Sequence, residues 1–149
     1  MTAAVLSVAV LSAGQGASAA DRVVSYQIVN AQEIPASLTG QSGNAETGRQ
    51  IYFDRQLTGC SGCHGSPGGP GAEAASGQDN APQLSNLLAR MTEGTIRLWL
   101  VAPSVLSPQT EMPSYYTIGQ RRDPTDPRFG EPLLSAAEIE DLIAYLTRQ

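Results

Sequence analysis

The clearest helical pattern in the chain lies at its C-terminal end. Ser135 and Glu138 have the spacing of a capping box, in which two side chains satisfy backbone N–H groups at the start of a helix. Apolar residues then recur at helical spacing and form one stripe: Ala136, Ile139, Ile143 and Leu146. We therefore predict an amphipathic helix from Ser135 to the C-terminus.

A second helical pattern lies in the middle of the chain. Thr92 is suited to cap a helix over residues 93–101, and Pro103 would end it. The apolar residues on one face of this helix are Ile96, Trp99 and Leu100. We expect that face to line the interior.

A third helix is expected over residues 44–57, capped by Asn44 and carrying Ile51 and Tyr52 at helical spacing. Gly48 lies inside it, where glycine costs about 1 kcal/mol relative to alanine. Such a glycine suggests a close contact with another helix. A shorter helix is expected over residues 84–91.

The remaining segments lack a regular pattern. Residues 21–43 are expected to form an extended N-terminal arm that wraps the domain. Residues 65–82 form a loop rich in Gly and Pro, long enough to surround something large. Residues 104–134 contain five prolines and are expected to be mostly irregular. The sum predicts an all-α fold, with one domain over residues 44–149.

Composition narrows the function classes. The 149 residues fit one domain, and the formal charge of −5 argues against nucleic acid as a partner. Aromatic residues make up only 5% of the chain. A buried cofactor would supply the large apolar body that so small a domain otherwise lacks.

Residues 60–64 read Cys-Ser-Gly-Cys-His and carry the candidate chemistry. Cys-x-x-Cys-His is the attachment motif of c-type haem. The sulfurs of Cys60 and Cys63 would form thioethers to the haem, and His64 would ligate its iron. The sequence therefore predicts one covalent haem c.

Two other interpretations of the motif are weaker. A dithiol redox pair of the thioredoxin kind needs a βαβ context, whereas Gly and Pro surround Cys60. A structural zinc usually takes four protein ligands, and the chain has two Cys and one His in all.

Two methionines, Met91 and Met112, are candidates for the second axial ligand, since the chain has no second His and no Lys. Met112 precedes Pro113 in an irregular segment, where the backbone is able to bring a thioether to iron. Met91 lies next to a helix cap, where filling a gap in the core is an alternative role. We predict His64 and Met112 as the ligands; an empty sixth site would suit a catalytic or gas-sensing haem.

Residues 1–20 have the pattern of a signal peptide. A short apolar run is followed by small residues, with cleavage expected near Ala19 or Ala20. The run is too short to span a bilayer as a permanent helix. Because bacteria attach haem c outside the cytoplasm, we expect a periplasmic protein with no membrane span after the signal is removed.

The order of elements resembles that of small soluble class I cytochromes c. In that fold the first and last helices cross closely, which would place Gly48 against Tyr145. The resemblance also implies that a backbone carbonyl after the haem motif, often that of a proline, orients the His ring. Pro82 stands at the corresponding place.

More specifically, residues 97–99 (Arg-Leu-Trp), residues 112–116 (Met-Pro-Ser-Tyr-Tyr) and the final helix resemble the SoxX family. Members are the monohaem subunits of SoxAX cytochrome complexes, and the resemblance spans residues 33–149. Residues 66–80 depart from it, because this Gly- and Pro-rich stretch is longer than the family's link.

The SoxX resemblance implies a heterodimer with a SoxA-like dihaem or monohaem cytochrome. Such complexes couple thiosulfate oxidatively to a cysteine of the carrier SoxYZ, in an L-cysteine S-thiosulfotransferase reaction. The chemistry is assigned to a cysteine-ligated haem of SoxA. The SoxX haem accepts the electrons and passes them to a downstream cytochrome. No catalytic residue of this chain's own is visible.

A free-standing cytochrome that shuttles electrons between larger complexes is the main alternative. The arm, the Pro-rich segment and Tyr115 with Tyr116 favour a partner instead, because exposed aromatic residues suit the cores of interfaces. The alternative for the two tyrosines is that both pack on the haem.

Overall fold

The computed structural model describes residues 23–66, 81–82, 84 and 88–149. These residues form five helices, and their only β pairing is an isolated bridge between Val29 and Glu33. The all-α fold class is thus confirmed. The expected signal peptide, most of the Gly- and Pro-rich loop and part of the expected helix over residues 84–91 lie outside the described residues.

The helices begin where the capping residues predict. Asn44 accepts hydrogen bonds from the backbone of α1 (Ala45–Phe53), and Thr92 does so for α4 (Glu93–Val101). Ser135 and Glu138 complete a capping box at α6 (Ala136–Leu146). Helix α2 (Cys60–His64) carries the Cys-x-x-Cys-His motif.

The structure differs from the sequence prediction at the end of α1, after α4, and at the end of α6, which stops at Leu146. Helix α1 ends at Phe53 instead of Leu57, because the Asp54 carboxylate accepts the N–H groups of Gln56 and Leu57 and turns the chain. Pro103 does follow the end of α4, but it also begins a further short helix, α5 (Pro103–Leu106). Proline is favoured at a first helical position, where its missing N–H costs nothing.

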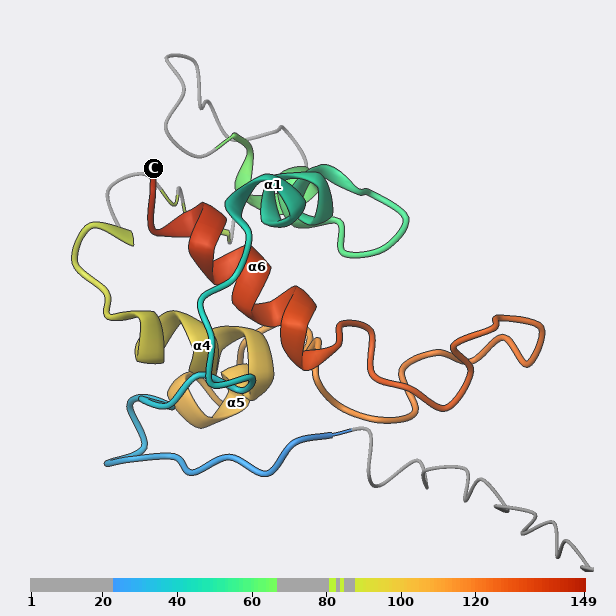
Figure 1. The fold of residues 1–149 in the computed structure, drawn as a ribbon, viewed down its shortest axis with the longest axis horizontal. Helices are drawn as coiled ribbons and strands as arrows, with labels where there is room; N and C mark the ends of the chain where they lie inside the picture. The colour runs from blue at the N-terminus through green and yellow to red at the C-terminus, as the bar shows by residue number, and fades with distance from the viewer. Residues whose placement is uncertain (1–22, 67–80, 83, 85–87) are drawn as a thin grey trace, which may run out of the picture.

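Helix α1 crosses α6 at very short range, as Figure 1 shows. A methyl group added at Gly48 would overlap the backbone carbonyl of Asp141 and come within 2.9 Å of the Tyr145 Cβ. One added at Gly43, just before α1, would overlap the backbone at Glu140 and Asp141. The expected contact between Gly48 and the last helix is therefore confirmed.

On another side of α6, a buried ion pair joins it to α4. The Arg97 guanidinium donates two hydrogen bonds of 2.8 Å to the two carboxylate oxygens of Glu140. Arg97 also donates to the Ile34 carbonyl (2.7 Å), and the Leu38 amide donates to Glu140 (2.9 Å). The pair thus holds the arm as well as the two helices, and Figure 1 shows the arm running past α4 toward α1.

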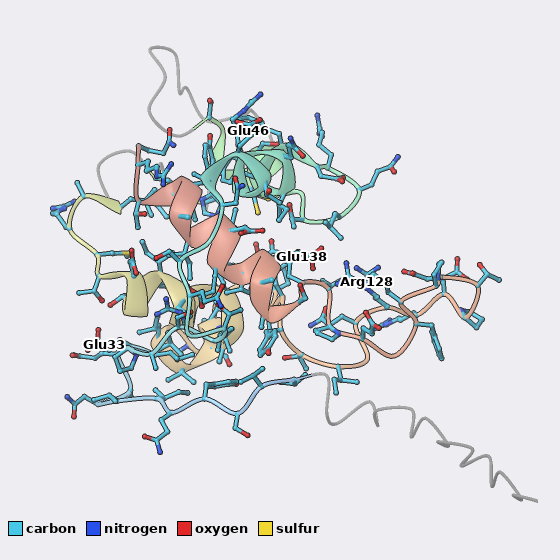
Figure 2. All side chains as sticks on the ribbon, viewed as in Figure 1. Glu33, Glu46, Arg128 and Glu138 are labelled. Atoms are coloured by element: carbon cyan, nitrogen blue, oxygen red, sulfur yellow. The ribbon has the colours of Figure 1, made fainter. Side chains whose placement is uncertain are left out.

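A protruding segment, residues 118–133, precedes α6 and is stabilised by arginines. Arg121 binds Asp126 and the carbonyls of Pro132 and Leu133, which ties the two ends of the segment together. Arg128 binds Glu138 through both terminal guanidinium nitrogens, and Figure 2 shows the two side chains beside each other. The segment is therefore fixed to the start of α6.

We predict that Gly48→Ala destabilises the protein, although alanine is normally the better helix residue. The added methyl group has no room against the α6 backbone. Overpacking of this kind costs about 1–3 kcal/mol and exceeds the gain of up to about 1 kcal/mol in helix propensity. Thermal unfolding of the haem-loaded protein measures the effect.

Gly62→Ala is the matched control, because the nearest atom to its added methyl group is an Arg55 nitrogen at 4.0 Å. It should unfold at or above the wild-type temperature. A Gly48→Ala protein as stable as this control would contradict the close crossing.

A second prediction concerns acid stability. Burial alone would raise the pKa of Glu138, but hydrogen bonds from Arg128 and Ser135 lower it below its ordinary value. A lowered folded-state pKa gives stability that is present above the unfolded-state pKa and is lost as the pH falls through the folded one. Glu138→Gln should therefore cost about 1 kcal/mol at neutral pH and much less below about pH 3.

Denaturant unfolding of wild type and Glu138→Gln at both pH values checks this. Glu46→Gln is the control, because the ion pair of Glu46 with Arg49 is long (3.6 Å) and exposed. If the wild type and Glu138→Gln lose stability in parallel on acidification, the carboxylate does not have this role.

Candidate haem site

A cavity of about 650 Å³ lies between α2, α4, α6 and the segment before Tyr115. This volume is within the range of cofactor sites in proteins. Its walls are largely apolar and include Leu84, Leu88, Ile96, Trp99, Leu100, Leu142 and Leu146. The three α4 residues predicted to face the interior, Ile96, Trp99 and Leu100, all line the cavity.

The three residues of the attachment motif lie on this cavity. Gly59 (φ +66°) directly precedes α2 and Gly65 (φ +69°) directly follows it, both in backbone conformations that glycine adopts readily. One helical turn separates Cys60 from Cys63, so both lie on the same side of α2. Cys60 is buried and Cys63 half-buried, and no disulfide joins them.

The His64 ring has a defined partner. Its Nδ1 lies 2.9 Å from the carbonyl oxygen of Pro82. A hydrogen bond at Nδ1 leaves Nε2 with its lone pair available for a metal. On the other side of the motif, the Tyr52 hydroxyl donates to the Gly65 carbonyl at 2.8 Å. These two contacts hold the end of α2 and the imidazole at the cavity wall.

Both candidate thioether ligands, Met91 and Met112, lie on the cavity. The Met91 amide donates to the Leu88 carbonyl just before the cap of α4. Met112 lies in an irregular segment that is anchored directly after it: Ser114 donates to the Val101 carbonyl (2.5 Å) and the Tyr115 amide to the Leu100 carbonyl (2.9 Å).

The expectation that Tyr115 and Tyr116 are exposed is wrong, since they are 4% and 3% exposed. Only Tyr115 lies on the cavity, so the alternative that both pack there is also only half right. Tyr116 turns to the arm, where its hydroxyl accepts the Val24 amide (2.8 Å) and its ring lies 6.4 Å from that of Tyr26.

Burial determines the protonation of the polar groups on the cavity. It raises the pKa of the Tyr52 and Tyr115 hydroxyls well above the usual range, and negative charge on the nearby thiols would raise both further. It also raises the pKa of the Cys60 thiol. Both phenols therefore stay protonated and remain hydrogen-bond donors at all physiological pH values.

The sequence did not indicate Tyr52 as part of the site, and it placed Tyr115 there only in the alternative that both tyrosines pack on the haem. Tyr52 lies one helical turn after Gly48, and its ring packs on Tyr145 at 5.5 Å. The spacing to Gly48 was therefore a signal that Tyr52 faces the last helix. Nothing in the local sequence of Tyr115 distinguishes it from Tyr116, because only the turn of the backbone directs one inward.

The residues on the cavity fit a haem. Two thiols and an imidazole on one short helix face an apolar space that two methionine side chains also reach. No group of three or more His, Cys, Asp and Glu side chains suited to a metal ion is present among the described residues. The arrangement thus lacks the ligands of a zinc centre.

Comparisons with known proteins agree with this site. A family profile described as Cytochrome c matches residues 45–149. The chain is also similar to a chain in the crystal structure of SoxXA from P. pantotrophus, at 29% identity with a TM-score of 0.63. That match covers 80% of this chain and 91% of the other and confirms the resemblance seen in the sequence. No curated protein sequence matches.

Proposed function

The chain belongs to the cytochrome c family, and we propose that it is the electron-accepting, SoxX-like subunit of a periplasmic SoxAX-type complex. Membership of the family implies a covalent haem c and electron transfer. Within the described residues no helix is long and apolar enough to cross a membrane. The partner, the axial ligands and the location are the parts that we propose.

In this proposal Cys60 and Cys63 hold the haem through thioethers, and His64 provides the first iron ligand. The bound haem supplies a one-electron Fe(III)/Fe(II) couple. The Pro82 carbonyl, 2.9 Å from His64 Nδ1, keeps the ring oriented and its Nε2 available. The apolar walls keep water from the site, which together with a thioether ligand favours a raised reduction potential.

We assign the second axial ligand to Met112. The Ser114 hydroxyl and the Tyr115 amide both donate to carbonyls at the end of α4. The Met112 thioether is therefore held at the cavity by a segment without helical constraints. Pro113 stiffens the chain directly after it. Met91 is instead committed to the turn that leads into α4, where an apolar side chain helps to fill the wall.

The extent of the SoxXA match carries the proposal of a partner. It covers 80% of the chain, more than residues 45–149 make up, so it extends into the arm as well as the cytochrome domain. The arm is held to the core by Arg97 and Glu140. It also presents apolar side chains to solvent: Val24, Tyr26, Ile28 and Val29 are each 38–46% exposed. A free-standing cytochrome without a stable partner would not need an exposed apolar surface on the arm.

The reaction served would be the coupling of thiosulfate to a carrier cysteine of SoxYZ. Forming the new S–S bond from a thiol and thiosulfate releases two electrons and a proton. A monohaem subunit accepts electrons singly and passes them to a downstream cytochrome. No catalytic group is needed on this chain, because the bond would form at the thiolate-ligated haem of the SoxA-like partner. Residues 1–20 would direct export to the periplasm.

Co-expression with a SoxA-like cytochrome from the same organism tests the partner. We expect a stable heterodimer on size exclusion, and Val24→Ser with Ile28→Ser should weaken it about tenfold or more by removing buried apolar area. Phe129→Ser is the matched control, because Phe129 is a 51% exposed apolar side chain of the protruding segment and does not belong to the arm. A haem-loaded monomer that never associates would support the free shuttle instead.

Met112→Ala tests the ligand. We expect haem to remain attached through Cys60 and Cys63, the far-red band of Met-ligated ferric haem to disappear, and carbon monoxide to bind the reduced protein readily. Axial ligands move haem potentials over about 0.8 V, so the potential should fall by on the order of 0.1 V. Met91→Ala is the control and should keep the band. If the band is lost in Met91→Ala and kept in Met112→Ala, Met91 is the second axial ligand instead.

A further inference from the structure

We infer that Tyr115 is the positioning residue that keeps the Met112 thioether on the iron. The inference rests on the ligand role proposed for Met112. Tyr115 follows Met112 by three residues and joins the segment carrying that ligand to the segment carrying the haem attachment. It would act through the placement of its neighbours and would not itself bind iron.

The backbone of Tyr115 is fixed on both sides. Its N–H donates to the Leu100 carbonyl in α4 at 2.9 Å. Its carbonyl accepts the Leu134 N–H at 2.8 Å, directly before the cap of α6. Tyr115 is therefore bound to α4 and to the residue before the cap of α6, and its side chain enters the cavity from a fixed point.

The side chain of Tyr115 then reaches the haem-attachment segment. Its hydroxyl donates to the Thr58 carbonyl at 3.1 Å and lies 3.9 Å from the Cys60 sulfur. Thr58 is itself anchored, because its hydroxyl donates to the Ile51 carbonyl of α1 at 2.7 Å. When the sulfur of Cys60 is a thioether it has no hydrogen to donate, and the bond to Thr58 is the link that remains.

Removing the hydroxyl would release this link while leaving the ring in place. The Thr58 carbonyl would lose its donor, and the segment from Met112 to Tyr115 would keep its bonds to α4 and Leu134 but lose its link to the haem-attachment segment. Met112 would then leave the iron more often. An added ligand that competes with the thioether would then bind more tightly, by the factor by which the dissociated form of Met112 becomes more populated.

The test is Tyr115→Phe in the haem-loaded protein, with imidazole as the competing ligand for ferric iron. We expect normal haem content, a weaker far-red band and an imidazole affinity raised about 3- to 10-fold, the range for the loss of one hydrogen bond. Tyr116→Phe is the control, because it loses its bond to Val24 on the arm side but does not line the cavity. It should leave the band and the imidazole affinity unchanged.

A double variant separates positioning from a direct effect on the haem. With Met112→Ala already present there is no thioether to displace, so adding Tyr115→Phe should not change imidazole affinity further. An equal gain in both backgrounds, or no difference between Tyr115→Phe and Tyr116→Phe, overturns the inference. A far-red band that survives Met112→Ala overturns the proposed ligand itself, and the inference with it.

Discussion

One turn of α6 joins α1, α4 and the N-terminal arm. The Glu140 carboxylate binds Arg97 of α4 and the Leu38 amide of the arm, and the Arg97 guanidinium extends the network to the Ile34 carbonyl. At the next residue, the Asp141 carboxylate accepts a hydrogen bond from the Asn44 amide at 2.6 Å. The backbone carbonyl of Asp141 lies against Gly48 of α1. Because a buried charge needs its partner and all its hydrogen bonds, this turn allows one arrangement of α1, α4 and the arm.

The cavity follows from that arrangement. With α1 and α4 both fixed against α6, the side chains of Leu142 and Leu146 face a space that α2 closes with its two cysteines and His64. No buried side-chain polar atom of the described residues lacks a hydrogen-bond partner, so the scaffold around the cavity is fully satisfied. A small domain with few aromatic residues can then use a large apolar cofactor as part of its core.

The same contacts suit electron transfer more than catalysis. The imidazole is held by Pro82, the attachment segment by Tyr52 and Tyr115, and the Met112 segment by the C-terminal end of α4. A haem held by both segments would change oxidation state with little movement of its ligands. The apolar side chains on the arm lie outside this rigid centre, where a partner is able to approach without disturbing it.

Local chemistry made much of this predictable. Caps at Asn44, Thr92 and Ser135 set the starts of the helices, and the spacing of Cys60, Cys63 and His64 specified a haem, because these features depend on residues close together in the chain. Gly48, a glycine inside a predicted helix, correctly indicated a close helix crossing. The buried pair of Arg97 and Glu140, the turn of Tyr115 toward the cavity and that of Tyr116 toward the arm depended on tertiary structure. Each joins segments tens of residues apart, and sequence spacing carries no information about which of two neighbouring side chains the folded backbone directs into the cavity.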